Sequence, residues 1–336
     1  MRILLTGGCG FIGSHTAVAL TDAGHEPILL DNFSNSAPEV AQRIAKIIGR
    51  ELTIIAGDVL DASLVRSTLR DQRIDAVIHF AALKAVAQSV ADPLAYYINN
   101  VGGILSVLAA MQDKQVRTLV FSSSATVYGE PEQLPIDETH PTRSANPYGE
   151  AKLICEKILA DIVRADPRWR VSLLRYFNPV GAHPSALIGE DPKGIPNNLM
   201  PLLVRAAREK LEALPVFGTD YPTGDGSAVR DYIHVADLAE GHVAALEKLC
   251  RSGGAQAYNL GTGRGTSVLE LIAAFEKATG VKVPHVGAPR RPGDVAELFA
   301  ATEKAERVLG WRARRGLAEM CADSWRFAKS QSEPEA

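Results

Sequence analysis

The chain has 336 residues, of which 46% are hydrophobic and 22% charged, as expected for a soluble globular protein of about two domains. Its net charge of −3 and lack of a basic run longer than residues 312–315 make nucleic acid and anionic membranes unexpected partners. The four cysteines, at 9, 155, 250 and 321, show no C-x-x-C spacing, which argues against a metal site or a disulfide framework and favours a reducing cytoplasm.

A strand, a glycine turn and a helix are predicted at the start of the chain. Residues 2–6 are apolar, residues 7–13 read GGCGFIG, and residues 14–23 have helical spacing. The glycines at 8, 10 and 13 fit G-x-G-x-x-G, in which the backbone turns tightly, approaches a pyrophosphate and packs the helix on the strand. The position between a strand and a helix favours a dinucleotide site over a glycine turn without a ligand.

A second strand at 27–30 ends at Asp31, which lies 18 residues after Gly13. An acidic side chain at this place can accept hydrogen bonds from an adenosine ribose. It would repel a 2′-phosphate, and residues 32–36 offer no arginine to hold one, so NAD is predicted rather than NADP. The alternative is a plain turn carboxylate.

Repeated βα units predict a Rossmann-type, doubly wound parallel sheet covered by helices on both faces. The predicted units after Asp31 are helix 38–48, strand 52–56, a helix capped by Asp61, strand 76–80, a helix from Pro93, strand 118–122, a helix from Pro147, strand 171–176, helix 235–251 and strand 257–260.

Polar residues follow the third and fourth strands, at the edge where such sheets bind ligands. Asp58 could hold an adenine amino group, or it could belong to a helix-capping turn. Lys84 could reach a cofactor phosphate, although a lone lysine in a loop is more often merely solvated.

Tyr148 and Lys152 lie four residues apart on one face of the helix that begins at Pro147. A tyrosine has an unperturbed pKa near ~10, so a tyrosine base needs about three units of depression, roughly 4 kcal/mol, from positive charge. Lys152 could supply much of it, and an oxidised nicotinamide ring is a second cation. A surface helix that holds both residues by chance is the alternative.

Three serines, residues 122–124, end the strand that precedes this helix. One of them could hydrogen-bond the same substrate oxygen as Tyr148, or they could be ordinary polar residues at a strand end.

Organisation changes after residue 176, where proline, glycine and asparagine become frequent between 177 and 232. Helices are predicted at 198–211 and 268–279. We expect an NAD-binding domain at 1–176, to which 233–264 return, a smaller C-terminal α/β substrate-binding domain at 177–232 and 265–330, and a polar, frayed tail from Lys329, of which 331–336 lie outside both domains. The apolar run 101–111 is shorter than the ~18 residues of a membrane span.

The chain resembles the extended short-chain dehydrogenases/reductases over nearly its full length, and in particular those that epimerise UDP-hexoses at C4. Residues 6–13 (TGGCGFIG), 121–129 (FSSSATVYG) and 148–152 (YGEAK) are typical of the superfamily. The motifs closest to the epimerases are residues 175–184 (RYFNPVGAHP), 194–201 (GIPNNLMP) and 229–235 (VRDYIHV).

The resemblance implies cofactor and substrate contacts residue by residue, with Tyr148, Lys152 and Ser124 as the catalytic groups. The implied NAD contacts are Gly7, Gly10, Phe11, Ile12, Gly13, Asp31, Asn32, Phe33, Ser34, Asn35, Ser36, Asp58, Val59, Phe80, Ala81, Ala82, Leu83, Lys84, Asn99, Tyr148, Lys152 and Phe177. The implied UDP-hexose contacts are Ser124, Tyr148, Asn178, Asn198, Leu199, Pro215, Val216, Phe217, Arg230, Arg291, Asp294 and Leu298.

Two arginines suit a diphosphate, because a guanidinium matches its fork of oxygens, and Asp294 suits a ribose hydroxyl. Singly, Arg230 or Arg291 could be a surface cation. The resemblance places Leu298 beside the 2-substituent of the sugar as a gate of intermediate size, whereas its apolar neighbours also allow a place in the core. It further implies a homodimer through the helices from Pro93 and Pro147.

The resemblance therefore implies reversible epimerisation of UDP-glucose and UDP-galactose at C4, in galactose metabolism, with bound NAD. A 4,6-dehydratase on the same scaffold is one alternative, but those relatives have Asp-Glu where this chain has Ala125 and Thr126. A dinucleotide-sensing protein is another, although sensing requires neither Ser124 nor the Tyr148 and Lys152 pair.

Overall fold

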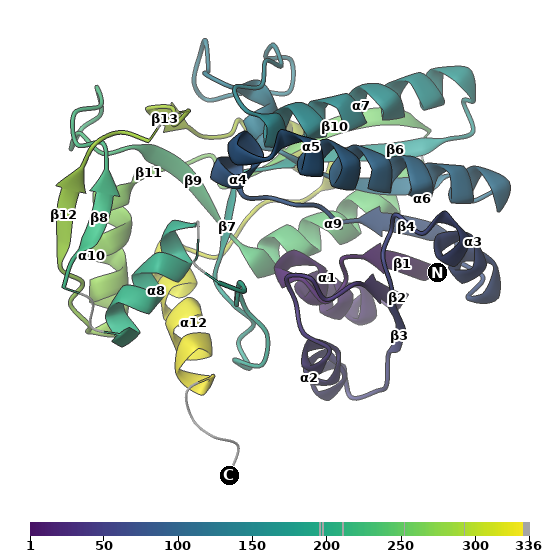
Figure 1. Ribbon diagram of the computed structural model, residues 1–336, viewed down its shortest axis with the longest axis horizontal. Coiled ribbons are helices and arrows are strands. Elements are labelled where there is room, and N and C mark those ends of the chain that lie inside the picture. The colour runs from purple at the N-terminus through teal and green to yellow at the C-terminus, as the bar shows by residue number, and fades with distance from the viewer. Residues whose placement is uncertain (195, 197, 210–211, 252, 292, 332–336) are drawn as a thin grey trace.

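A seven-stranded parallel sheet forms the larger part of the protein (Figure 1). The computed structural model describes residues 1–331 except 195, 197, 210–211, 252 and 292. From one edge to the other, the sheet contains β10 (Gly254–Leu260), β6 (Arg170–Tyr176), β5 (Thr118–Ser124), β4 (Ala76–His79), β1 (Arg2–Thr6), β2 (Glu26–Asp31) and β3 (Thr53–Ala56). The predicted seven strands and their parallel pairing are confirmed.

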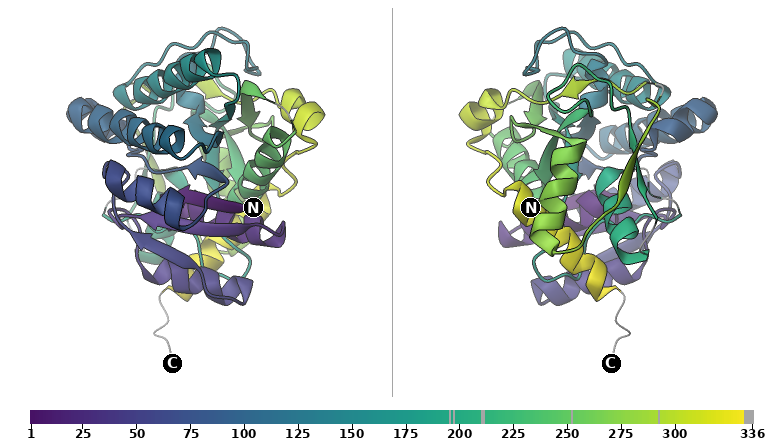
Figure 2. Two further views of the ribbon diagram at one scale, coloured as in Figure 1. Left: turned by 90° about the vertical axis from the view of Figure 1, so that its right-hand side faces the viewer. Right: turned by 90° about the vertical axis from the view of Figure 1, so that its left-hand side faces the viewer.

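Helices cover both faces of this sheet, as Figure 2 shows in two views from opposite sides of the molecule. Ile3 and Leu5 point to one face and Leu4 to the other, and all three are fully buried, which explains an apolar run with no alternation. The first face is covered by α1 (Phe11–Asp22), α2 (Glu39–Ile48), α9 (Val235–Leu249) and α11 (Glu303–Leu309). The second face is covered by α3 (Ala62–Asp71), α6 (Gly102–Asp113) and α7 (Pro147–Ala165). The predicted Rossmann-type fold class is confirmed.

The glycine turn between β1 and α1 depends on glycine at two places. Gly7 has φ +69°, a left-handed conformation that makes the turn. A Cβ on Gly13 would lie 2.4 Å from the carbonyl oxygen of Gly7, so only glycine lets α1 pack this closely on the turn. The helix begins at Phe11, three residues before the predicted Ser14.

The helix predicted from Pro93 is part of a longer helical segment. It follows α4 (Val86–Ala91) and consists of α5 (Pro93–Tyr96), a π-helical turn (Tyr97–Val101) and α6. The combined segment Pro93–Asp113 has 21 residues and a mean hydropathy of 1.4, so by length and composition it could span a membrane, contrary to the expectation from residues 101–111. One side of it packs against α3 and α7 beside the sheet, as in the core of a globular protein.

The smaller part contains short strands that the sequence did not predict. They are β7 (Asn178–Val180), β9 (Val229–His234), β11 (Gly265–Ser267) and β13 (Glu297–Leu298) in one sheet, and β8 (Leu214–Phe217) and β12 (His285–Ala288) in another. Three helices, α8 (Leu199–Glu209), α10 (Val268–Thr279) and α12 (Leu317–Ser330), enclose a second core with them. The predicted helix 268–279 is confirmed, and residues 210–211 of the predicted helix 198–211 lie outside the described residues.

Two expected boundaries differ in the structure. Helix α11 contacts α9 and β10, and the Trp311 indole donates to the carbonyl of Asp237 at 2.9 Å, so this segment belongs to the larger part rather than to the smaller one. Lys329 and Ser330 end α12 rather than starting a frayed tail. The tail from residue 332 lies outside the described residues.

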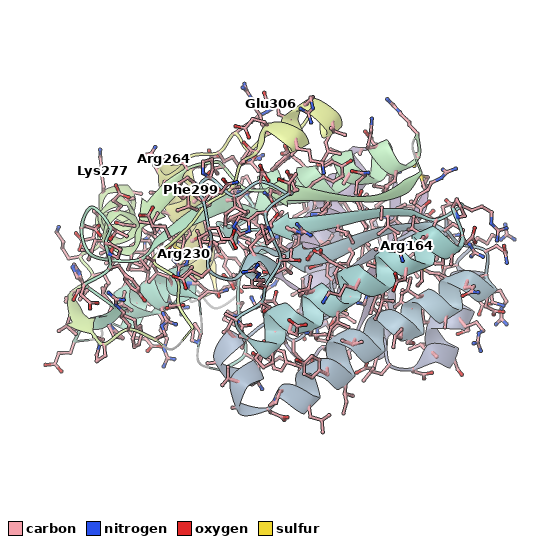
Figure 3. The ribbon with its side chains drawn as sticks, turned by 90° about the horizontal axis from the view of Figure 1, so that it is seen from above. Arg164, Arg230, Arg264, Lys277, Phe299 and Glu306 are labelled. Carbon is pink, nitrogen blue, oxygen red and sulfur yellow. The ribbon has the colours of Figure 1, made fainter. Side chains whose placement is uncertain are left out.

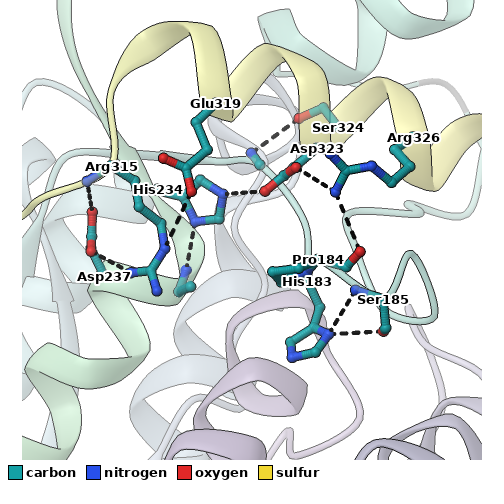
Figure 4. A network of polar contacts seen from close by, with 12 residues as sticks. His183, Pro184, Ser185, His234, Asp237, Arg315, Glu319, Asp323, Ser324 and Arg326 are labelled. Carbon is teal, nitrogen blue, oxygen red and sulfur yellow. Dashed lines mark hydrogen bonds and ion pairs between the residues drawn. The ribbon is translucent and has the colours of Figure 1, made fainter.

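A buried polar network ties α12 to β9 and to the start of α9 (Figure 4). The His234 ring accepts from the N–H of Ala236 through Nδ1 and faces Asp323 through Nε2 at 3.3 Å. Burial lowers the pKa of His234, so the neutral ring donates to that carboxylate. Ser324 accepts from the N–H of Gly181 at 3.1 Å. These contacts join the end of the strand that carries Arg230 to the last helix.

Candidate active site

A cavity of about 770 Å³ lies between the C-terminal edge of the large sheet and the smaller part. It is lined by nearly every residue that the sequence assigned to cofactor or substrate. Phe33 is the exception: its ring packs against the core beside α1 and α2, and the loop contributes its neighbours Asn32 and Ser34 instead. The cavity therefore brings the two predicted groups of residues into one space.

The N-terminus of α1 opens onto this cavity through Gly10, Phe11, Ile12 and Gly13. The N–H groups of a first helical turn have no acceptor within the helix, and no side chain among the described residues caps them. These donors and the positive end of the helix dipole suit a pyrophosphate. The residues present therefore fit a dinucleotide.

Asp31, at the end of β2, is 6% exposed and held by three donors. Its Oδ2 accepts from the N–H of Cys9 at 2.9 Å, and its Oδ1 accepts from the N–H of Phe33 and the hydroxyl of Ser36, both at 2.8 Å. These bonds fix the carboxylate at the rim of the cavity, where a ribose would find further acceptor lone pairs.

Asp58 lies beside this end of the cavity, with both oxygens engaged by the protein. One accepts from the N–H of Leu60 at 2.9 Å and the other from the amide of Asn32 at 2.8 Å. The cap of α3 is Asp61, as predicted, because its carboxylate accepts from the N–H groups of Ser63 and Leu64. Asp58 thus braces two cavity loops rather than capping the helix.

Residues 187–193 line the cavity and contact loops of the larger part, and the sequence analysis did not identify them as site residues. Glu190 accepts from Lys84 Nζ and from the amide of Asn198, both at 2.9 Å. Lys193 donates to the carbonyl of Phe33 at 2.7 Å. Lys84 is therefore neither free in solvent nor a lone cation. The pairing of distant segments left no local signal from which these contacts could be found.

Tyr148 and Lys152 project from the first turns of α7 into the cavity. Asn146 caps the helix by accepting from the N–H of Gly149 at 2.9 Å, which fixes where the helix begins. A Cβ on Gly149 would lie 2.9 Å from the carbonyl oxygen of Thr126, so glycine lets this turn lie against the short 3-10 turn that follows β5. Lys152 Nζ donates to the carbonyl of Ser122 at 2.6 Å.

Ser124 is the one of the three serines that faces Tyr148. It forms a hydrogen bond with the Tyr148 side chain. Its hydroxyl oxygen also accepts from the N–H of Thr126 at 3.2 Å and from the Thr126 hydroxyl at 3.0 Å. Because its lone pairs are engaged there, the Ser124 proton is directed to the phenol or to a substrate oxygen.

The electrostatics of the tyrosine differ from the expectation in one respect. Burial raises the pKa of Tyr148 above its ordinary value, and the hydrogen bond with Ser124 opposes this shift without cancelling it. Burial also lowers the pKa of Lys152 to about 8. In the protein by itself the lysine thus does not outweigh desolvation, and a phenolate requires the second cation that the sequence analysis invoked.

The other end of the cavity carries two arginines around one carboxylate. Asp294 lies 3.8 Å from Arg230 and 3.7 Å from Arg291. Arg230, labelled in Figure 3, lies on β9 of the smaller part. The Arg291 guanidinium stacks over the Phe217 ring, 4.3 Å from its centroid. Two cations, an aromatic face and a carboxylate are the groups that a nucleoside diphosphate needs.

Leu298, on β13, lies both in the core and at the cavity, the two positions that the sequence analysis considered. It is 8% exposed and packs in a cluster with Ala125, Leu153 and Phe177. It also lines the cavity.

Among the described residues, no group of three His, Cys, Asp or Glu side chains could hold a metal ion.

Comparison with known proteins gives the same assignment. Residues 3–261 match the model of the NAD dependent epimerase/dehydratase family. The chain is 59% identical to a UDP-glucose 4-epimerase of Bacillus subtilis, with 98% of this chain and 97% of the relative covered.

Two solved structures are similar over almost their whole length. One is the UDP-glucose 4-epimerase of Stenotrophomonas maltophila with bound NAD and formylated UDP-arabinopyranose, with 48% identity, a TM-score of 0.97 and 99% of each chain covered. The other is the enzyme of Bifidobacterium longum in complex with NAD+ and UDP, with 49% identity, a TM-score of 0.95 and 98% of each chain covered. The chain belongs to the NAD dependent epimerase/dehydratase family, in the branch of the UDP-glucose 4-epimerases.

Proposed function

We propose that this protein interconverts UDP-glucose and UDP-galactose by reversible epimerisation at C4 and that it keeps NAD bound throughout. The observation that carries the proposal is that Tyr148, Ser124 and Lys152 line the same cavity as the groups that suit a dinucleotide and the two arginines Arg230 and Arg291. We further propose that the reaction serves galactose metabolism in the cytoplasm, which agrees with the free state of all four cysteines.

The cofactor would be held by the N–H groups at the start of α1, by Asp31 and by Lys84. When bound, oxidised nicotinamide supplies positive charge and a reversible hydride acceptor for C4. Tyr148, as phenolate, takes the proton of the 4-hydroxyl group and later returns it. Ser124 donates to the same oxygen and holds it in place. Lys152 stabilises the phenolate with its charge.

The smaller part would bind the UDP. Arg230 and Arg291 are positioned for the diphosphate, Phe217 for the base and Asp294 for the ribose, with Asn178, Asn198 and Leu199 lining the sugar end. Epimerisation requires that the 4-keto sugar present both faces to the same catalytic groups. Binding free energy must therefore come mainly from the UDP, while the sugar is free to rotate about the diphosphate.

A dehydratase on this fold would need a further acid and base beside Tyr148. Ala125 and Thr126 occupy the turn after Ser124, and the Thr126 hydroxyl donates to Ser124 at 3.0 Å. Neither residue can carry out that proton transfer at neutral pH. We therefore expect mass spectrometry of the products from UDP-galactose to show UDP-hexose only. A 4-keto-6-deoxy product, lighter by one water, would overturn the assignment as an epimerase.

Substrate breadth is expected to depend on Leu298. Leucine fills part of the space beside the sugar and can change rotamer at a cost of roughly 1 kcal/mol. We expect efficient turnover of UDP-glucose and weaker but measurable turnover of UDP-N-acetylglucosamine. The comparison is wild type against Leu298→Tyr and Leu298→Ser with both substrates. An unchanged ratio of kcat/KM in both variants would show that Leu298 is only a core residue.

We also propose a homodimer through the helical segment from Pro93 (α5 and α6) and the helix from Pro147 (α7), with α4 beside them. This face exposes Val90, Leu94, Ile98 and Leu105, which are between 48% and 65% accessible. Apolar side chains in such a group mark an interface. Light scattering should therefore give twice the chain mass, and the double variant Leu94→Asp/Ile98→Asp should be monomeric with an unchanged circular dichroism spectrum. A monomeric wild type at micromolar concentration would contradict the proposal.

A further inference from the structure

A buried ion pair lies one helical turn beyond Lys152. Glu156 follows Lys152 by four residues and Tyr148 by eight, so all three lie along one side of α7. Glu156 is 5% exposed and its partner, Arg175 on β6, is 7% exposed. The epimerisation mechanism uses neither residue.

The pair has the geometry of a strong, fixed contact. Arg175 Nη2 donates to Glu156 Oε2 at 2.6 Å and Arg175 Nε donates to Oε1 at 3.0 Å. The Ser123 hydroxyl donates to Oε1 at 2.5 Å, and Ser123 lies opposite Arg175 in the pairing of β5 and β6. The third arm of the guanidinium donates to the Tyr128 hydroxyl at 3.1 Å. Each formal charge is thus matched by a partner in the core.

The end of β5 connects this pair to the catalytic groups. Ser123 donates to Glu156, the carbonyl of its neighbour Ser122 accepts from Lys152, and the next residue, Ser124, bonds Tyr148. An unpaired carboxylate at position 156 would attract the lysine along the helix. Its negative charge would also oppose a phenolate in the same buried region.

We propose that Arg175 and Glu156 are positioning residues for the reaction at Tyr148. Arg175 neutralises Glu156, so that Lys152 stays on the Ser122 carbonyl and its positive charge acts undiminished on the tyrosine. Glu156 fixes α7 to the ends of β5 and β6 through Ser123 and Arg175. The positive charge of Arg175 offsets the negative charge of Glu156, which would otherwise disfavour the Tyr148 phenolate.

The other titratable groups around the catalytic pair would be unchanged in a test. Burial lowers the pKa of His79, on β4, to about 3, so this ring is neutral. Burial raises the pKa of the remaining neighbours, and these groups are neutral as well: Cys155 on α7, Tyr96 on α5 and Tyr176 on β6. Among these described neighbours, Lys152 and the Glu156–Arg175 pair are thus the groups that carry a formal charge.

The test is the pH dependence of kcat/KM, which rests on the proposed function. Activity should rise as Tyr148 ionises and fall as Lys152 loses its proton. Glu156→Gln adds net positive charge, so both limbs should move to lower pH by about one unit. Arg175→Met leaves net negative charge, so both limbs should move to higher pH. The double variant Glu156→Gln/Arg175→Met should return close to the wild-type profile.

A matched control lies on the same helix. Asp161→Asn breaks the exposed pair of Asp161 with Arg164, which are 2.8 Å apart with side chains 69% and 78% accessible, and should leave the profile unchanged (Arg164 is labelled in Figure 3). If Arg175→Met does not fold, because it leaves a buried carboxylate unpaired, Glu156→Gln and the double variant decide the question. Unshifted limbs in Glu156→Gln, or a double variant shifted as far as Glu156→Gln, would overturn the proposal.

A second readout does not depend on turnover. The ultraviolet absorbance of the Tyr148 phenolate follows from the difference between each protein and its Tyr148→Phe counterpart during a pH titration of the holoenzyme. The same opposite shifts are expected in Glu156→Gln and Arg175→Met. If the two variants shift the Tyr148 titration in these opposite directions but the wild-type protein converts no UDP-hexose, the proposed function is refuted and the positioning role remains supported.

Discussion

Replacing Tyr148 by phenylalanine is expected to lower the rate of epimerisation at least ~10²-fold, the scale of general acid and base catalysis. The substitution removes one hydroxyl group. The ring should keep its edge-on packing against Tyr96, 6.5 Å away between centroids, and the cap of α7 at Asn146 is untouched. Steady-state kinetics with UDP-galactose measure the loss, which should be in kcat rather than KM because the UDP contacts lie elsewhere.

Tyr97→Phe is the matched control for this variant. It removes the same group from a tyrosine on the neighbouring π-helical turn, and that tyrosine does not belong to the cavity lining. Its turnover should equal that of the wild type. Near-normal turnover in Tyr148→Phe, with an unchanged melting temperature and bound NAD, would show that Tyr148 is not the base.

NAD is expected to bind at least ~10²-fold more tightly than NADP, because like charges brought together in a binding site cost several kcal/mol. The carboxylate of Asp31 is buried and held by Cys9, Phe33 and Ser36, so it cannot turn away from a 2′-phosphate. Titration of apo-protein with both cofactors measures the ratio. Asp31→Asn should narrow it, since the amide keeps the shape of the side chain and loses its charge.

The structure shows two positively charged side chains in the cavity lining that the sequence analysis did not predict as site residues. They are Lys193 and Arg43. Lys193 is bound to the Phe33 carbonyl and Arg43 donates to Gln331 at 2.7 Å, so both are engaged within the protein. Equal affinities for the two cofactors would show that these cations, and not Asp31, govern the choice.

The parts of the fold that sequence predicted are those that local physics determines. Helix α10 has the predicted bounds 268–279, and the structure shows that local groups determine them: Ser267 and Glu270 form a capping box, and Gly280 ends the helix in a left-handed conformation. The seven sheet strands stand out as short apolar runs between turns. In contrast, β13 has two residues and exists through its pairing with β9, for which two residues carry no periodic signal.

The candidate site shows the same division. The positions of Tyr148 and Lys152 follow from helical spacing, and the glycine turn from its place between a strand and a helix. The bonds of Glu190 to Lys84 and of Lys193 to Phe33 join residues more than a hundred positions apart, so tertiary packing alone creates them. The raised pKa of Tyr148 also depends on burial, which spacing does not reveal.

The most direct test of the central claim is a coupled assay of UDP-galactose conversion by the purified holoenzyme without added NAD. Gel filtration first removes loose cofactor from the epimerase, which is then incubated with UDP-galactose alone. Samples are withdrawn and quenched, and the UDP-glucose in each sample is measured afterwards with an excess of an auxiliary dehydrogenase and its own NAD. The auxiliary NAD therefore never reaches the active epimerase. The expected result is sustained formation of UDP-glucose through many turnovers per chain, up to equilibrium with UDP-galactose. Purified holoenzyme that contains NAD and produces no UDP-glucose from UDP-galactose would contradict it.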